Sequence, residues 1–289
     1  MVAYTFNSGS INPSLDDTLI VTIPKVDNPS SMKDFKPISL CNEAFKIVYK
    51  VLVNMIMPFL DTIIRPFQSS FIPKRGTMDN VVIAQEIAHH MHKKKGKSGY
   101  LMYKIDFEKA YDMVDWNFLK LTLTECGFPQ KLIDFIMSCT TTTSLSLKWN
   151  SEILDSFSPT RGLKKGDPMS PYLFVLCMEN LALLIQEKVQ ENLWEPVKIS
   201  SNGSQVSHFF FANYCILFTK ANATQVHLVN QVLQSFCKVV VFKVSLNLRL
   251  LLLIILQGIK FKVLKLFLNL VTPLVLTSIL VPYPNWESM

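Results

Sequence analysis

The chain has 289 residues, 49% of them apolar, which is enough for one large domain or two ordinary ones and excludes global disorder. Its net charge of +7 suits a polyanionic partner such as nucleic acid, although an ordinary basic enzyme has the same balance. Six cysteines without a CxxC pair, and a polar segment after Met1, predict an intracellular protein, nuclear or cytoplasmic, that is not secreted.

The first part of the chain is predicted to contain short extended segments and two helices. Residues 20–23 have the composition of a strand, and residues 42–60 have the apolar spacing of a helix that we expect Pro58 to break. A polar loop at 68–80 then leads into a second helix, whose apolar residues recur at spacings of three and four.

The densest basic run, HHMHKKKGK at 89–97, ends that second helix. Its three histidines stand at spacings of one and two, which do not place them on one helix face, so a zinc site is disfavoured. A solvated basic helix end that attracts phosphate is the better interpretation, because cations also complement the helix dipole.

A half-buried strand is predicted at 100–106, where apolar and polar residues alternate. The strand ends on the carboxylate of Asp106, and a strand end can hold a catalytic metal ligand rigidly. A solvated aspartate at a strand-to-helix junction is the alternative that this stretch by itself leaves open.

The remaining predicted elements follow in order up to residue 237. Asp115 caps a helix that stops at Gly127, a second helix follows Pro129, and a hairpin turns around Ser151 and Glu152. A glycine-containing loop then opens a strongly apolar helix. The apolar runs within 208–219 form a hairpin, and an amphipathic helix covers 223–237.

Beyond Val239 the character of the sequence changes, and residues 248–280 are strongly apolar with few charges and no clear period. Its longest uninterrupted apolar run, at 250–256, is too short to span a bilayer, so we expect a disrupted or partly buried tail and no membrane association, with a membrane-tethered tail as the alternative.

Five blocks, taken together in this order, closely resemble the reverse transcriptase domain of non-LTR (LINE-type) retrotransposons, especially the plant form. The blocks lie at 23–47, 68–80, 104–116, 161–174 and 209–218. The resemblance implies an α+β right-hand polymerase, in which fingers and an antiparallel palm sheet packed on helices carry the site. It also implies an RNA template, a DNA primer, deoxynucleoside triphosphates and Mg²⁺ or Mn²⁺ as partners and cofactors, because nucleotidyl transfer uses two cations held by hard oxygen ligands.

The same resemblance implies a domain division. Residues 1–96 correspond to fingers, residues 97–238 to the palm with a fingers insertion at about 114–164, and residues 239–289 to an apolar tail in place of the thumb.

The resemblance also implies roles for individual residues of this chain. Asp106 and the backbone carbonyl of Phe107 correspond to metal ligands, and Tyr111 corresponds to the aromatic residue beneath the nucleotide sugar. Residues matching the nucleotide-binding and template-lining positions are Lys74, Arg75, Lys165, Gly166, Asp167, Pro168 and Ser170. Lys93, Lys94 and Lys95 are candidates for contact with a nucleic-acid backbone, with a solvated helix end as the alternative.

The chain departs from the family where catalysis needs carboxylates. The family turn reads Phe-Ala-Asp-Asp, whereas this chain has Phe211, Ala212, Asn213 and Tyr214. Lys165 also replaces the usual glutamine, and Lys36 replaces the usual arginine. We therefore expect a degenerate copy with impaired catalysis, a pseudoenzyme, with a non-catalytic nucleic-acid-binding remnant and a non-functional relic as alternatives.

Overall fold

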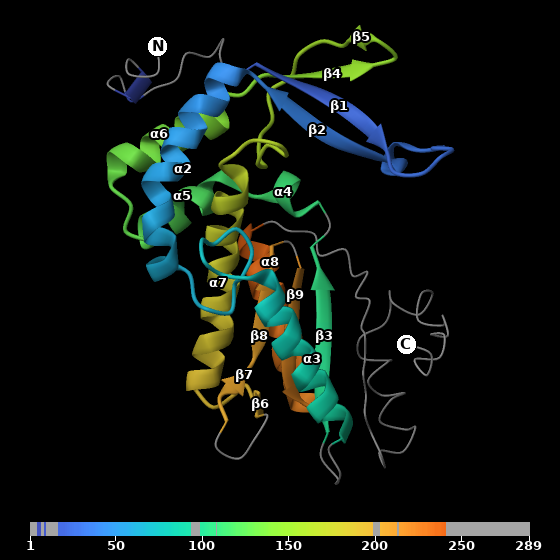
Figure 1. The fold of residues 1–289 in the computed structure, drawn as a ribbon, viewed down its shortest axis with the longest axis vertical. Coiled ribbons are helices and arrows are strands. Elements are labelled where there is room, and N and C mark those ends of the chain that lie inside the picture. The colour runs from blue at the N-terminus through green and yellow to red at the C-terminus, as the bar shows by residue number, and fades with distance from the viewer. Residues whose placement is uncertain are drawn as a thin grey trace.

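The computed structural model describes residues 5–6, 9, 17–93, 99–107, 109–198, 203–212 and 214–240 (Figure 1). The first half contains β1 (Thr18–Pro24), the 3₁₀ helix η2 (Met32–Asp34), β2 (Phe35–Cys41), α2 (Glu43–Ile63), α3 (Thr77–Lys93), β3 (Tyr100–Asp106), α4 (Ala110–Met113), α5 (Trp116–Glu125) and α6 (Gln130–Thr141). The second half contains β4 (Leu145–Trp149), β5 (Glu152–Ile153), α7 (Ser170–Gln190), β6 (Val197–Lys198), β7 (Gln205–Val206), β8 (His208–Phe211), β9 (Tyr214–Lys220) and α8 (Ala223–Val240).

The strands β2, β1, β4 and β5 form, in that order, a four-stranded sheet that we call the outer sheet. β1 pairs antiparallel with β2 and parallel with β4. Of the residues in these strands, only Thr18 and Cys41 are buried, so the outer sheet joins the core at one end. Figure 1 shows the β1–β2 hairpin projecting from the rest of the molecule.

The helix predicted at 42–60 is confirmed as α2, but the expected break at Pro58 is wrong. Asn42 caps its start by accepting a hydrogen bond from the Ala44 backbone N–H at 2.9 Å. Pro58 lies on the exposed side of the helix, where the carbonyl four residues earlier can be hydrated. The flanking Ile56 and Leu60 are fully buried, and their packing keeps the last turn helical.

The strands β3, β9 and β8 form the central sheet, which is antiparallel throughout. One face of this sheet packs in the main core with α2 and α5 to α8. The other face packs on α3 through Phe209, Phe211 and Phe218, and Figure 1 shows α3 crossing the sheet on that side. A central antiparallel sheet between helices confirms the expected α+β class.

The two predicted hairpins are confirmed, with their turns shifted. The first turns at Asn150 and Ser151, whose φ angles of 47° and 69° are typical of a tight hairpin turn, one residue earlier than expected. In the second, Ala212 has φ 53° and Tyr214 already begins β9, so the turn contains fewer residues than predicted.

The helix predicted to be capped by Asp115 is confirmed as α5, and the helix predicted after Pro129 is confirmed as α6. Asp115 accepts hydrogen bonds from the backbone N–H groups of Asn117 and Phe118, and Gly127 follows the helix with φ 78°.

No helix within the described part of the chain is long and apolar enough to cross a membrane. The predicted apolar tail at 239–289 lies outside the described residues, except for its first two positions.

Candidate active site

The central sheet brings the end of the predicted catalytic strand opposite the 209–218 block. Asp106 of β3 pairs with Tyr214 of β9, and Tyr214 in turn pairs with Phe211 of β8. Directly paired residues of an antiparallel sheet point to the same face, so these three side chains form one row. Residue 213, predicted to stand at a lost aspartate, lies outside the described residues.

Tyr214 and the neighbouring Lys104 bring an aromatic ring and a positive charge to this row. The Tyr214 ring stacks on Phe211 with centroids 4.9 Å apart and an interplanar angle of 13°. Lys104, two residues before Asp106 on the same face, places its Nζ 5.2 Å from the Tyr214 ring. Partial burial raises the pKa of the Tyr214 hydroxyl, so the phenol is neutral at physiological pH.

The donor set of the row does not fit a pair of divalent cations. Asp106 is its one carboxylate, Tyr214 contributes a neutral phenol, and the sequence has an amide at position 213. Within the described ranges, no cluster of three or more His, Cys, Asp or Glu side chains could hold a metal ion. Two hard dications need several negatively charged oxygens, and the nearby Lys104 adds a positive charge instead.

Phe107 and Tyr111 follow Asp106 in the sequence, pack in the main core and are fixed there by aromatic contacts. The Tyr111 ring stacks on Phe174 of α7 with centroids 4.5 Å apart, and burial, aided by the nearby Asp167, raises the Tyr111 pKa to about 12. Phe107 is buried and meets the ring of Phe236 edge-on. Their predicted roles toward the sugar and the metal stay predictions.

The loop at 161–169 links the outer sheet to α4. The Ser39 backbone N–H of β2 donates to the Lys165 carbonyl at 2.9 Å. The Lys165 Nζ forms an ion pair with Asp112 of α4 at 2.5 Å. Gly166 has φ 117°, and an added Cβ there would lie 2.9 Å from the Ser39 carbonyl oxygen, so this contact requires glycine.

Asp167 and Ser170 organise the start of α7. The buried Asp167 carboxylate accepts hydrogen bonds from the Met169 and Ser170 N–H groups and from the Ser170 hydroxyl, at 2.6–2.7 Å. Burial raises the Asp167 pKa, although those hydrogen bonds oppose the shift. Both side chains face the helix start, while Pro168 is half-buried beside them. Their predicted contact with a template strand stays a prediction.

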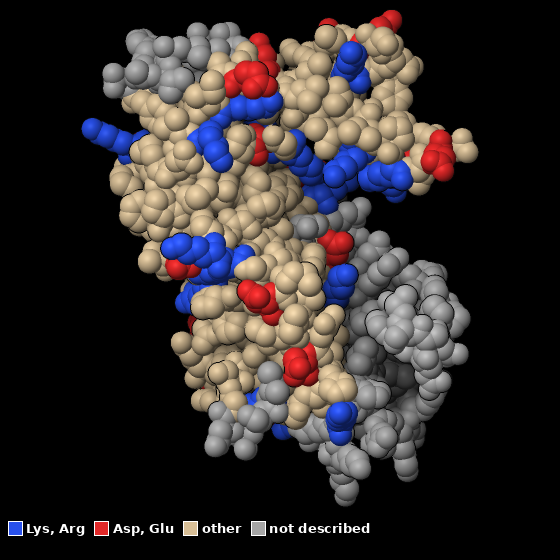
Figure 2. Space-filling view, viewed as in Figure 1, with Lys and Arg blue, Asp and Glu red and all other residues tan. Residues whose placement is uncertain are grey.

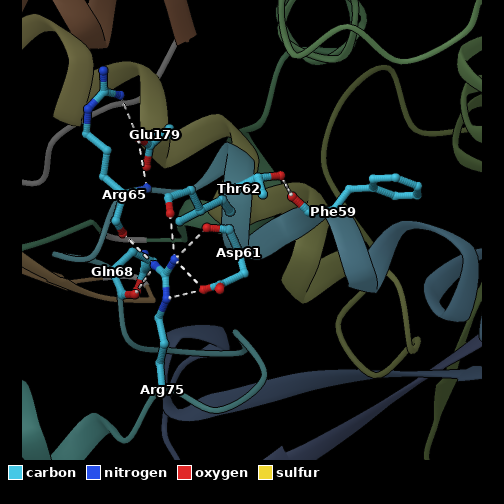
Figure 3. Close-up of polar contacts among 8 residues, drawn as sticks. Phe59, Asp61, Thr62, Arg65, Gln68, Arg75 and Glu179 are labelled. Carbon is cyan, nitrogen blue, oxygen red and sulfur yellow. Dashed lines mark hydrogen bonds and ion pairs between the residues drawn. The ribbon is translucent and has the colours of Figure 1, made fainter.

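Arg75 lies at the end of α2 with its guanidinium surrounded by protein oxygens (Figure 3). Its Nε and Nη2 donate to the Asp61 carboxylate at 3.0 and 2.8 Å. Its remaining hydrogen bonds go to the backbone carbonyls of Asp61, Ile64, Arg65 and Gln68. In this arrangement Arg75 caps the C-terminus of α2, whereas the neighbouring Lys74 is exposed.

Arg65 extends this network to α7. Its guanidinium donates to the Glu179 carboxylate at 2.8 Å, and Glu179 is only 5% exposed. Burial raises the Glu179 pKa while the Arg65 partner lowers it. Neither this pair nor the pair between Lys165 and Asp112 was predicted, because their members are far apart in sequence and no local pattern marks them.

Basic side chains gather on the outer sheet. The β1–β2 hairpin and its connection carry Lys25, Lys33 and Lys36, all exposed. Figure 2 shows lysine and arginine side chains on the underside of this hairpin, facing a hollow. Lys93 ends α3 and is exposed, whereas the predicted Lys94 and Lys95 lie outside the described residues.

The central antiparallel sheet packs on helices and carries Asp106 at the end of its edge strand β3, which is the architecture of a right-hand polymerase. A family model described as "Reverse transcriptase (RNA-dependent DNA polymerase)" matches residues 23–247. The chain belongs to this reverse transcriptase family, and the expected relation to non-LTR retrotransposons is confirmed by its relatives.

Two of its relatives illustrate the similarity. The retrovirus-related Pol polyprotein from the type-2 retrotransposable element R2DM of Drosophila melanogaster is 28% identical over 181 residues, which is 63% of this chain and 17% of that protein. The transposon TX1 uncharacterized 149 kDa protein of Xenopus laevis is 26% identical over 64% of this chain and 14% of its own length. The chain thus spans about a sixth of these curated relatives.

A solved structure confirms the right-hand polymerase fold. Apo telomerase from Candida tropicalis, truncated from its C-terminal domain, superposes with a TM-score of 0.53 over 78% of this chain and 47% of that chain. The sequence identity is 12%, so this similarity concerns the fold alone.

Proposed function

We propose that this chain is a reverse transcriptase domain that binds a template–primer duplex but whose nucleotidyl transfer is impaired. The row formed by Asp106, Tyr214 and Phe211 carries this proposal, because it offers one carboxylate and a lysine where two cations would need several anionic ligands. Loss of charged ligands at such a site weakens transition-state stabilisation by several kcal/mol.

The proposal assigns the parts of the chain by analogy with the family. Residues 1–96 act as fingers, 97–238 as the palm with its insertion at about 114–164, and 239–289 replace the thumb. RNA template, DNA primer and deoxynucleoside triphosphate are the ligands, and Mg²⁺ or Mn²⁺ would supply Lewis acidity where it binds. The exposed lysines of the β1–β2 hairpin support retained binding to the nucleic-acid backbone.

Primer extension on an RNA template, with Mg²⁺ or Mn²⁺, tests the catalytic half of the proposal. We expect no extension by the unaltered chain and measurable extension by the double variant Asn213→Asp/Tyr214→Asp, because it restores two carboxylates beside Asp106. Adding Asp106→Asn to that variant should abolish the gain. Extension by the unaltered chain would contradict the proposal.

Duplex binding, followed by fluorescence anisotropy, separates impaired catalysis from general loss of function. We expect both the unaltered chain and the double variant to bind an RNA–DNA duplex. The logarithm of the binding constant should fall linearly with the logarithm of the salt concentration. A melting curve for each protein shows whether loss of the Tyr214–Phe211 stack has unfolded the variant. A folded chain that fails to bind would favour the non-functional relic.

A further inference from the structure

An apolar groove lies on the helical side of the molecule, between α5, α7 and α8. Its volume is about 460 Å³, and its lining includes Leu121, Leu183, Phe236 and Val239. Leu121, Leu183 and Val239 are 53%, 43% and 58% exposed, which is unusual for neighbouring large apolar side chains. The groove faces away from the Asp106 row, because the helices that form it cover the opposite face of the central sheet.

The rim of this groove carries acidic side chains. Glu125 on α5 and Glu187 on α7 both line it, and both are exposed. Arg65 also lines the groove, but its guanidinium is already bound to Glu179 at 2.8 Å. Lys188 stands 4.0 Å from Glu187 and makes its shorter contact, 2.7 Å, with Glu191. An occupant with an apolar face and positive charges would therefore match the groove.

The residues that follow α8 in the sequence have the properties of such an occupant. Val239 lines the groove, and α8 ends at Val240, so the following residues start at its edge. Within 242–250 apolar residues occupy every even position and polar residues every odd one. This period of two predicts an extended segment with one apolar face. The segment carries Lys243 and Arg249 and no acidic residue.

We propose that residues 242–250 dock in the α5–α7–α8 groove of the same chain. The even-numbered apolar side chains cover Leu121, Leu183 and Val239, and burial of this apolar surface drives the docking. The long side chains of Lys243 and Arg249 reach sideways to the acidic rim and fix the position of the segment. The inference does not depend on the proposed function.

Photo-crosslinking in the full chain tests this proposal. A benzophenone amino acid replaces Leu183 in the groove, and in a control protein it replaces Val82, which is similarly exposed at 52% but lies on α3. After irradiation, mass spectrometry maps the crosslinked peptides. We expect position 183 to crosslink within one chain to peptides containing residues 242–250, and position 82 not to do so.

Charge reversal tests the rim contacts without altering the apolar surface. Glu125→Lys/Glu187→Lys should lower the crosslink yield several-fold, and adding Lys243→Glu/Arg249→Glu should restore it. Melting curves verify that each exposed-charge variant is folded. Crosslinks from position 183 to other segments, or equal tail crosslinking from positions 82 and 183, would overturn the proposal. Crosslinks only between isotopically labelled and unlabelled chains would overturn it too, because the occupant would then be a second copy.

Discussion

Arg75 occupies a loop position that the family resemblance associates with triphosphate binding, yet its guanidinium is saturated by oxygens at the end of α2. The Asp61 carboxylate and four backbone carbonyls accept all of its hydrogen bonds, and its side chain is only 16% exposed. Releasing this side chain toward a phosphate would leave those carbonyls without their donors. Its observed role is therefore to hold the 68–80 loop on α2.

Arg75→Ala should lower the free energy of unfolding by about 2–3 kcal/mol, because hydrogen bonds to a charged group are worth more than neutral ones. Arg75→Lys should lose part of that amount, since an ammonium cannot reproduce the planar fork. Urea denaturation measures both changes. The matched control is Lys74→Ala, an exposed neighbour that should change stability by no more than about 0.5 kcal/mol. Equal effects of the two alanine variants would contradict the role of Arg75.

His208 is a fully buried base in the central sheet. Its Nδ1 lies 2.9 Å from the Ser207 hydroxyl, and the ring contacts Phe67 and Phe210. Burial, with a smaller contribution from the positive charge of Arg65, lowers the His208 pKa from 6.5 to about 3. The folded protein therefore keeps this imidazole neutral where the unfolded chain protonates it.

This pKa difference predicts how stability depends on pH. Between about pH 6.5 and 3 the unfolded chain binds a proton that the native His208 does not, so stability falls as the pH falls. The slope from this one group approaches about 1.4 kcal/mol per pH unit. Urea denaturation at several pH values should show a shallower dependence for His208→Gln than for the parent. Parallel pH profiles would contradict the assignment.

At the scale of elements, the 161–169 loop decides how the outer sheet meets α4. Two separate contacts hold it, the Ser39 to Lys165 backbone hydrogen bond and the ion pair between Lys165 and Asp112. Gly166 allows the loop to approach β2 closely, because an added Cβ there would lie 2.9 Å from the Ser39 carbonyl oxygen.

Gly166→Ala should destabilise the protein more than Gly127→Ala does. Both glycines have positive φ, 117° and 78°, but an added Cβ at Gly127 meets no atom within 4 Å. The control variant should lose about 1 kcal/mol from backbone strain, and Gly166→Ala at least about 1 kcal/mol more from the clash with Ser39. If urea denaturation gave equal losses of unfolding free energy for the two variants, the loop would be able to shift away from Ser39 at no energetic cost.

At the scale of the whole molecule, one core joins α2 to the central sheet. Side chains of α2, of β3 and β9, and of α5 to α8 belong to a single buried cluster. The outer sheet contributes little to it, since only Thr18 and Cys41 of its strands are buried. Local stability follows buried apolar contact, so the two sheets should differ in how easily they open.

Native-state hydrogen exchange should reveal this difference. The amides of β3 and β9 should exchange through global unfolding, whereas those paired between β1 and β2 should open at a free energy lower by at least about 2 kcal/mol. Added denaturant should accelerate exchange in the central sheet more strongly, because global unfolding exposes more surface. Equal protection of both sheets would mean that the outer sheet unfolds only with the core.

Local patterns determined most elements and the candidate catalytic strand. The alternation at 100–106 predicted β3 with Asp106 at its end, and Asp115 marked the start of α5, because strand period and capping depend on residues near in sequence. The joint order of five blocks predicted the reverse transcriptase family, which the family match confirmed. The substitution at Tyr214 could likewise be recognised from the sequence.

Tertiary contacts decided the rest. Pro58 stays inside α2 because Ile56 and Leu60 are buried around it, and a helix-breaking propensity cannot register that packing. The saturated guanidinium of Arg75, the inward carboxylate of Asp167 and the groove between α5, α7 and α8 depend on contacts that only the folded chain creates. Sequence by itself determined which residue types stand in the catalytic blocks. Only the fold decided which of their side chains already form hydrogen bonds within the protein. These hydrogen bonds, and the burial of the side chains, depend on contacts between segments that lie far apart along the chain.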